Sequence, residues 1–354
     1  MEHIEFSDNF GMDYFSGDGH GDGEGHGLGA FLGMDGHGDG GGDGQGFLMA
    51  ALDGFGGFGH DGGGDDGFAS VATAEYGFTV TNGQVTAMDR VFGTLTLPEH
   101  IPSDASFAVN ATTGVITETL TGSTAVETVV YTPDAGTSGV YQVTQETTTF
   151  TNPSTTTPSG ATHGVSFTIT GSTVTGMQEV VSFGNFSASE TVSLSPLTLF
   201  SVSGNTVTES TLQGNTIETN VYTEATGSTL YAKASDASTF ILPGTSTTAL
   251  DVNVHDQANF TIGTSGNVTQ VQAVSANGVT TTLMFPSTVT FQQVAPGFVQ
   301  ETVTAGTNSN FVLFYQGESG APYTEIAHGS GSTVDLVGVK AQLAEIPSGL
   351  TALL

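Results

Sequence analysis

The feature that most constrains the fold is a two-residue alternation of apolar and polar side chains, broken at short intervals by turn residues. Residues 165–170 read V-S-F-T-I-T, Gly171-Ser172 follows, and a second alternating run begins at Thr173. This pattern predicts two half-buried strands joined by a two-residue hairpin loop. The same device recurs at Asn82-Gly83, Gly122-Ser123, Gly204-Asn205 and Asn277-Gly278. Strands this short and this evenly spaced predict an all-β fold, either an antiparallel meander or a sandwich.

We assign this β-rich body to residues 71–335. Its polar positions are mainly Thr, Ser, Asn and Gln, and the β-branched side chain of Thr favours an extended backbone. A Thr/Pro/Ser-rich stretch at 147–160 marks a possible subdivision into two sheets or two domains. The segments around 164–183, 200–234 and 258–285 share a strand–turn–strand pattern without a visible fixed period. We interpret this similarity as irregular hairpin repetition.

Composition changes sharply near residue 70. Residues 1–70 contain 24 of the 51 glycines, 14 of the 35 acidic residues and no Lys or Arg. Ordering so much glycine is entropically costly, and the short apolar islands between the Gly/Asp runs are too small to bury a core. We therefore predict a disordered, low-complexity acidic arm over residues 1–70.

The charge balance excludes several classes of function. The chain has 3 Lys and Arg against 35 Asp and Glu, a formal net charge of −32. It cannot neutralise a row of phosphates, so we expect no nucleic-acid partner. The absence of Cys excludes disulfides, Cys-based metal sites and a thiol nucleophile.

The C-terminal segment 336–354 has a different pattern. Val339, Leu343 and Ile346 recur at helical spacing and predict a helix over residues 337–346. Pro347 ends this helix, and a hydrophobic tail, L-T-A-L-L, closes the sequence.

No transmembrane helix is expected, because no run of 18 apolar residues exists. Residues 1–15 also lack the positive and apolar regions of a Sec signal peptide. The helix-like 337–346, the tail 350–354 and the acidic Gly/Asp tracts resemble bacterial surface or matrix proteins exported by type I secretion, whose uncleaved signal is C-terminal. This resemblance implies an extracellular or cell-surface location.

The similarity to the calcium-binding RTX repeats of such proteins is compositional only. Residues 41–46 follow the first part of the family nonapeptide G-G-x-G-x-D-x-U-x, but Gly46 stands where the Asp belongs. The motif is therefore degenerate, and no parallel β-roll is predicted.

The arm contains the candidate metal ligands. Glycine-spaced carboxylates and backbone carbonyls supply the oxygen ligands that Ca²⁺ prefers. The candidate calcium ligands are Asp18, Asp22, Glu24, Asp35, Asp39, Asp43, Asp61, Asp65 and Asp66. Imidazoles beside some of these carboxylates suggest a transition-metal site, with candidates His20, His26, His37 and His60. The alternative for both sets is a solvated tract with only diffuse cation attraction.

No catalytic constellation stands out. Glutamates in the strand-like stretches could pair for glycoside cleavage, but solvated strand positions are the favoured interpretation. These residues are Glu118, Glu127, Glu179, Glu190, Glu209, Glu218 and Glu224.

The combined features favour an extracellular structural protein, such as a surface-layer, fibre, matrix or adhesin component, over an enzyme. We expect self-association that depends on calcium, with cell-surface polysaccharide as a further partner. The alternatives are a secreted β-fold polysaccharide-active enzyme and a non-catalytic carbohydrate-binding module.

Overall fold

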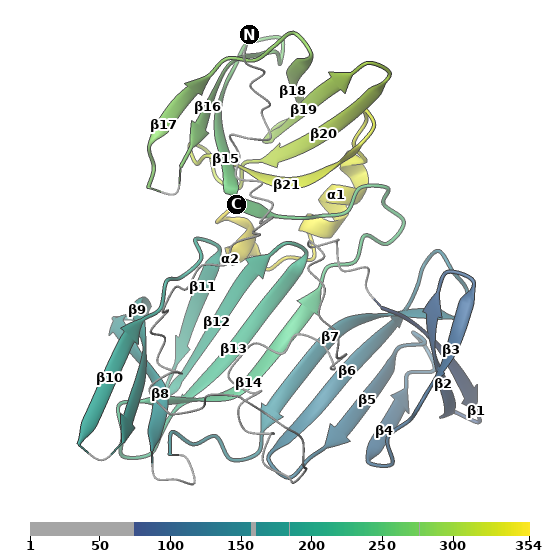
Figure 1. Ribbon diagram of the computed structural model, residues 1–354, viewed down its shortest axis with the longest axis vertical. Coiled ribbons are helices and arrows are strands. Elements are labelled where there is room, and N and C mark those ends of the chain that lie inside the picture. Colours follow the sequence, from purple (N-terminus) through teal and green to yellow (C-terminus); the bar gives the residue numbers. More distant parts are fainter. Residues whose placement is uncertain (1–73, 157–160, 184, 276) are drawn as a thin grey trace, which may run out of the picture. The chain divides into compact units, whose positions relative to one another are not determined.

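The computed structural model describes residues 74–156, 161–183, 185–275 and 277–354, and Figure 1 shows their arrangement. This part of the chain forms 21 strands and two short helices, and every strand pair is antiparallel. The predicted all-β antiparallel class and the C-terminal helix are therefore confirmed. The predicted arm over residues 1–70 lies outside the described residues.

The strands fall into three successive sets of seven, which we call repeats 1, 2 and 3. Repeat 1 (residues 75–150) contains β1 (Glu75–Thr81), β2 (Gln84–Phe92), β3 (Leu95–Glu99), β4 (Ala105–Val109), β5 (Ile116–Thr121), β6 (Ala125–Pro133) and β7 (Val140–Phe150). Repeat 2 (residues 162–240) contains β8 (Thr162–Thr170), β9 (Thr173–Phe183), β10 (Phe186–Thr191), β11 (Thr198–Ser203), β12 (Thr206–Gln213), β13 (Thr216–Glu224) and β14 (Tyr231–Phe240). Repeat 3 (residues 253–330) contains β15 (Asn253–Ile262), β16 (Val268–Val274), β17 (Thr280–Leu283), β18 (Val289–Ala295), β19 (Phe298–Ala305), β20 (Asn308–Tyr315) and β21 (Tyr323–Ser330).

All three repeats have the same strand order. The first three strands form one meander, the last four form a second, and the first strand pairs with the start of the seventh. The order within each repeat is therefore 3-2-1-7-6-5-4.

Irregularities in the pairing recur at matching positions as well. In the first hairpin of each repeat one strand carries an extra threonine, and its hydroxyl donates to a threonine carbonyl across the ladder. The pairs are Thr86 and Thr79 at 3.2 Å, Thr175 and Thr168 at 3.2 Å, and Thr269 and Thr261 at 3.1 Å. A second bulge in the last strand also recurs, at Thr144, Ala234 and Ile326. Bulges re-aim strands at defined places, so their repetition marks one structural unit used three times.

The expectation of irregular hairpin repetition is therefore wrong. Matching positions recur about 90 residues apart, which is the spacing of a tandem domain-sized repeat. The period is not obvious in the sequence, because loops of different lengths separate the matching strands and because threonine is common in many of these strands.

Repeats 1 and 2 share one sheet, joined through their last strands. Residues Gln145–Thr149 of β7 pair with Ser235–Thr239 of β14, centred on Thr147 opposite Ala237. These two central residues occupy the same position in their repeats, so the two units are related by an approximate twofold axis. The Thr/Pro/Ser-rich stretch 147–160 begins inside β7 and connects these two repeats.

Repeat 3 forms a separate sheet of seven strands. Its Ala327 matches Gln145 of β7, where the two other repeats pair. Ala327 is fully buried in a core cluster that also contains Leu250, Val252 and Val339. In repeat 3 this part of the last strand therefore contacts the connecting segment 241–252 and the C-terminal helices, whereas in repeats 1 and 2 it pairs with the last strand of the other repeat.

The C-terminal segment belongs to this core. The predicted helix appears as α1 (Leu336–Leu343), and α2 (Ser348–Thr351) follows Pro347. All three residues of the predicted apolar face, Val339, Leu343 and Ile346, are buried. Leu350 and Leu354 of the predicted tail are also buried in the same cluster.

Polar contacts hold α1 against the connecting segment. Asp335 caps the helix by accepting from the Gly338 N–H at 3.0 Å, and Ser246 donates to the same carboxylate at 3.1 Å. The buried Gln342 amide donates to the Thr248 carbonyl at 2.8 Å. Neither described helix is long and apolar enough to cross a membrane.

Candidate functional site

The metal ligands predicted from the sequence all lie outside the described residues. This applies to the calcium candidates from Asp18 to Asp66 and to the histidines from His20 to His60. Within the described ranges, no group of three or more His, Asp or Glu side chains is arranged to hold a metal ion. The candidate site must therefore come from side chains that the fold itself brings together.

An aromatic cluster occupies the interior of each repeat. It is built from four positions, one each on the first, fourth, sixth and seventh strands, with the ring of the first strand at the centre. The residues are Phe78, Phe107, Tyr131 and Tyr141 in repeat 1, Phe167, Phe200, Tyr222 and Tyr231 in repeat 2, and Phe260, Phe291, Phe314 and Tyr323 in repeat 3. Ring centroids lie 4.9–6.3 Å from the central Phe, mostly edge to face, which is the favoured geometry of aromatic pairs.

Each cluster contains a buried glutamate on the fifth strand. Glu118, Glu209 and Glu301 are 6%, 9% and 2% exposed and stand directly opposite the aromatic residue of the fourth strand. Two of these positions correct the sequence interpretation, which placed Glu118 and Glu209 among solvated strand residues. A carboxylate at such a place requires hydrogen-bond donors, because burial without them is costly.

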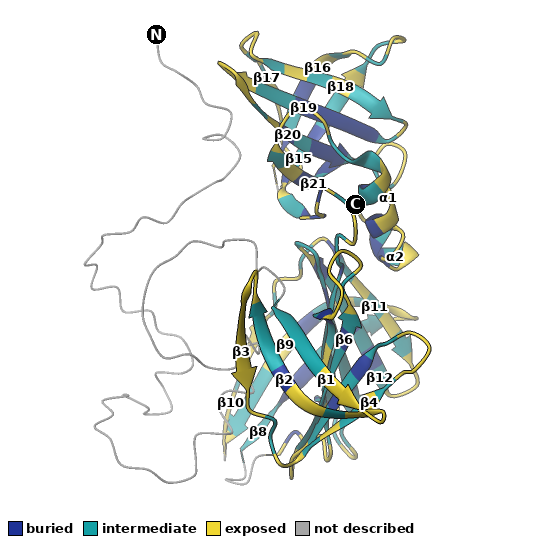
Figure 2. Cartoon of the chain, turned by 90° about the vertical axis from the view of Figure 1, so that its right-hand side faces the viewer, coloured by how far each residue is buried: buried dark blue, intermediate teal, exposed yellow. Residues whose placement is uncertain are grey.

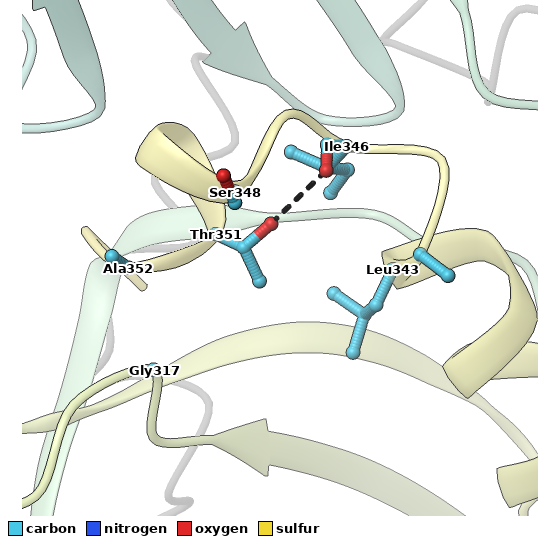
Figure 3. Close-up of a pocket in the computed structure, with 7 residues that line it drawn as sticks. Gly317, Leu343, Ile346, Ser348, Thr351 and Ala352 are labelled. Atoms are coloured by element: carbon cyan, nitrogen blue, oxygen red, sulfur yellow. Dashed lines mark hydrogen bonds between the residues drawn. The ribbon is translucent and has the colours of Figure 1, made fainter.

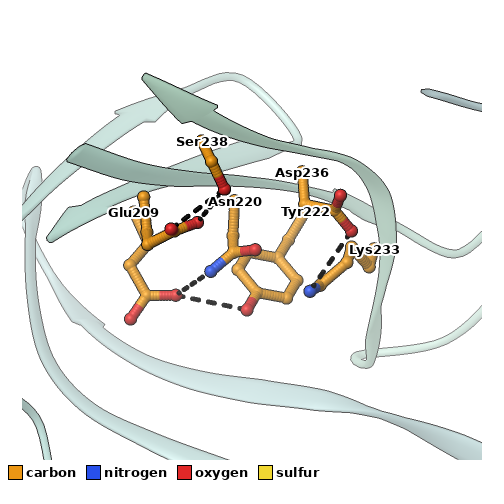
Figure 4. Close-up of polar contacts among 7 residues, drawn as sticks. Glu209, Asn220, Tyr222, Lys233, Asp236 and Ser238 are labelled. Atoms are coloured by element: carbon orange, nitrogen blue, oxygen red, sulfur yellow. Dashed lines mark hydrogen bonds and ion pairs between the residues drawn. The ribbon is translucent and has the colours of Figure 1, made fainter. Parts of the chain in front are cut away.

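The tyrosine of the sixth strand is the donor in the first two repeats. The Tyr131 hydroxyl donates to Glu118 at 2.7 Å, and the Tyr222 hydroxyl donates to Glu209 at 3.2 Å. Burial raises the pKa of Glu118, and the hydrogen bond from Tyr131 partly opposes that rise. Figure 4 shows the contacts in repeat 2, where the Asn220 amide also donates to Glu209 at 3.2 Å.

We expect Tyr131→Phe to destabilise the protein by about 1–3 kcal/mol, because it removes the donor and leaves the carboxyl of Glu118 buried. Chemical denaturation followed by circular dichroism would measure the change. Tyr141→Phe is the matched control, since Tyr141 belongs to the same aromatic cluster but does not contact Glu118 through a hydrogen bond. Equal unfolding midpoints for the two variants would contradict this role of the hydroxyl.

Repeat 3 departs from this arrangement. Phe314 takes the place of the tyrosine, so the hydroxyl that serves Glu118 and Glu209 has no counterpart. Burial, together with the charge of Glu325, raises the pKa of Glu301 to about 8. Glu301 is therefore largely protonated at neutral pH, in contrast to an exposed glutamate.

A second polar group lies at the start of β15 in repeat 3. The Asn253 amide donates to Asp256, and burial and the neighbouring Glu325 raise the pKa of that carboxyl. Glu325 also accepts from Nδ1 of His328 at 3.1 Å, while Asp251 lies 3.9 Å from Nε2 of the same ring. The hydrogen bond that His328 donates to Glu325 is the main cause of the raised pKa of His328. These side chains form a proton-sharing cluster beside Glu301.

Carboxylates also gather on the face of the shared sheet where repeats 1 and 2 meet. Directly opposite residues on neighbouring strands lie on one face of a sheet. One cross-strand row is Glu118, Val129, Glu146, Ser238 and Glu218, and the row related by the twofold axis is Glu209, Asn220, Asp236, Thr148 and Glu127. Burial and mutual repulsion raise the pKa of Glu146, and burial raises that of Glu218 despite two contacts from the Ser238 hydroxyl at 2.7 and 2.9 Å. Figure 4 also shows Lys233, whose Nζ lies 3.6 Å from a carboxylate oxygen of Asp236.

Two surface depressions in the described part of the chain are lined by residues other than these carboxyl groups. One, of about 380 Å³, lies beside α1 and α2 and is lined by Leu343, Ile346, Thr351 and the backbone near Gly317, as Figure 3 shows. Another, of about 450 Å³, lies around Thr132–Ala135 and Leu242. Neither brings together the nucleophile, base and donors that a catalytic site requires.

No protein-family model, no curated protein and no solved structure matches this chain. The three repeats are nevertheless similar to one another in sequence, because two short motifs occur in each of them. The first is F-T-[VI] at residues 78–80, 167–169 and 260–262, and the second is [IV]-[TQ]-E-[TS] at residues 116–119, 207–210 and 299–302. Aligning the sequence with itself at these motifs reveals the repeats and the recurrence of the three glutamates, but not that these glutamates are buried.

Proposed function

We propose that this chain is a structural protein that self-associates outside the cell or at its surface, as a component of a surface layer, a fibre, a matrix or an adhesin. One observation carries the proposal: the same seven-stranded unit occurs three times, and two copies are already joined edge to edge in one sheet. A unit that pairs with a copy of itself inside one chain can do so between chains, because sheet edges present unpaired backbone groups.

The charge of the chain sets the conditions for such assembly. A net charge of −32 drives copies apart at low ionic strength, whereas divalent cations screen or bridge carboxylates. The Gly/Asp runs of residues 17–67 supply oxygen ligands of the type that weak extracellular calcium sites use. Calcium-promoted assembly, export by a type I route and contact with cell-surface polysaccharide are parts of the same proposal.

Light scattering combined with negative-stain microscopy tests this function. Calcium would be raised from an EDTA-containing buffer to about 10 mM, which saturates weak extracellular-type sites. We expect ordered sheets or filaments to appear with calcium but not with an equal ionic strength of sodium chloride. A chain lacking residues 1–70 should keep its β-sheet circular dichroism and lose the calcium response.

A monodisperse monomer at every calcium concentration would overturn the proposal. That result would favour the alternatives, a polysaccharide-active enzyme or a carbohydrate-binding module, and would direct attention to the carboxyl pair Asp256 and Glu325.

A further inference from the structure

Two strands at the outer margins of the shared sheet occupy matching positions in repeats 1 and 2. β3 pairs only with β2, and β10 pairs only with β9, among the described residues. Leu95 opens β3 opposite Phe92, and Phe186 opens β10 opposite Phe183. Every residue of β3 is exposed, as Figure 2 shows in yellow, and so is every residue of β10 except Ala188.

The hairpin geometry determines which backbone groups of these strands point away from the sheet. The residues that flank a two-residue loop exchange hydrogen bonds with each other, and such pairs then alternate with non-bonded pairs along an antiparallel ladder. The outward-facing residues are therefore Thr96 and Pro98 in β3, and Ser187, Ser189 and Thr191 in β10.

The two edges differ at one matching position. Pro98 stands third after Leu95, and Ser189 stands third after Phe186. Proline has no N–H, so the outer edge of β3 lacks a donor where another strand would bond. β10 has a donor and an acceptor at all of its outward positions, and it contains no Pro, Lys or Arg that would discourage pairing.

We propose that β10 is the edge through which a second copy of this chain pairs with this one, antiparallel, β10 against β10. The inference rests on the proposed assembly function and names the contact that would form its dimeric unit. A register centred on Ser189 makes the contact twofold symmetric and lets the outward residues bond, Ser189 to Ser189 and Ser187 to Thr191. Glu190 then faces Ala188 of the other copy, so no like charges stand directly opposite.

Three features support a copy of the same chain as the partner. The interface between β7 and β14 is already a twofold antiparallel pairing of two such units. An isologous contact needs a self-complementary surface, and the symmetric register of β10 provides one. Phe183, 60% exposed at the end of β9, provides apolar surface next to this edge whose burial favours association.

Cross-linking tests the register directly, because the chain has no native Cys. Residues in a hydrogen-bonded antiparallel pair have Cα atoms about 5.5 Å apart, within reach of a disulfide. With calcium at about 10 mM and dissolved oxygen with a copper catalyst as oxidant, Ser189→Cys should become a disulfide-linked dimer. Thr96→Cys, on the β3 edge, is the matched control and should remain mostly monomeric.

A second variant tests the role of the outward-facing N–H of residue 189 as a hydrogen-bond donor between copies. Ser189→Pro places the residue of β3 at the matching position of β10 and removes an N–H that makes no bond within the sheet, so the circular dichroism spectrum and melting temperature should stay close to those of the wild type. Light scattering should show the loss of the dimer. The reverse change, Pro98→Ser, should create a second pairing edge and increase the assembled mass.

The outcomes separate the two proposals. If the wild-type chain assembles while Ser189→Pro assembles equally well, or Ser189→Cys does not cross-link, the assignment to β10 is overturned and the assembly function stands. The assignment to β10 is overturned in the same way if another segment of the chain occupies this edge and keeps Ser189→Cys monomeric. If the wild-type chain never assembles, the proposed function fails first.

Discussion

Replacing Leu350 by Ala should lower the free energy of unfolding by about 2–5 kcal/mol, the range for removing a fully buried leucine side chain. Leu350 is 0% exposed and packs in the core cluster that also contains Val339, Leu343 and Leu354. Leu353→Ala is the matched control, because Leu353 is 41% exposed and the change should cost less than about 0.5 kcal/mol. Denaturant titration of both variants would measure the difference, and equal midpoints would show that the segment contributes little to the core.

This prediction changes how the proposed secretion signal must be tested. Deleting residues 336–354 would remove buried side chains from the core as well as the proposed signal, so loss of export would have two explanations. Fusing residues 336–354 to an unrelated cargo protein distinguishes these two explanations. Export of the fused cargo would support a signal that is read before the chain folds, and retention of that cargo would argue against the type I route.

Replacing Glu301 by Gln should make the protein more stable at pH 8 and leave its stability at pH 4.5 nearly unchanged. Glu301 is 2% exposed, and its pKa is raised to about 8 from an ordinary value of 4.5. Between these two values the folded state binds more protons than the unfolded state, so wild-type stability falls as pH rises. The slope is at most about 1.4 kcal/mol per pH unit for one group. The amide of glutamine carries no charge and avoids that loss.

Thermal melts of wild type and Glu301→Gln across pH 4.5–8.5 would test this expectation. Glu318→Gln is the control, because Glu318 is exposed in the turn before β21 and its neutralisation removes no buried charge. Asp256 remains in both variants, and its raised pKa leaves part of the pH dependence in place. Parallel stability curves for wild type and Glu301→Gln would show that the carboxyl of Glu301 does not titrate in this range.

The local structure of most hairpins could be predicted from the sequence, although the loop predicted at Gly122-Ser123 lies one residue later, because the Gly122 N–H donates to the Ala125 carbonyl at 2.9 Å. Asn82 and Gly83 both adopt positive φ, at 54° and 77°, as a two-residue loop of that composition requires. Gly171 and Gly204 likewise have positive φ between paired strands. The helix at Val339–Leu343 could also be predicted, since its spacing of apolar residues is local. The alternation of apolar and polar residues and the residue preferences of turns act over a few positions, so both can be recognised in a single sequence.

The candidate site could not be predicted in the same way. Glu118 and Glu209 look like solvated strand residues because their neighbours in sequence are threonine and serine. Only the pairing of strands brings Tyr131 to Glu118 and Tyr222 to Glu209. The exception at Phe314 becomes visible only when repeat 3 is compared position by position with the other two.

By itself, the sequence determined the strand periodicity, the positions of most turns, the C-terminal helix and the excess of acidic over basic residues, because each depends on local geometry or on composition. The tertiary structure decided which strands pair, which of two similar edges keeps its hydrogen-bond donor, and that the apolar tail is core. Those outcomes depend on contacts between residues far apart in the chain. Many registers satisfy the same alternation of Thr with apolar residues, and the cost of burying carboxyl groups and the gain from packing aromatic rings select one of them.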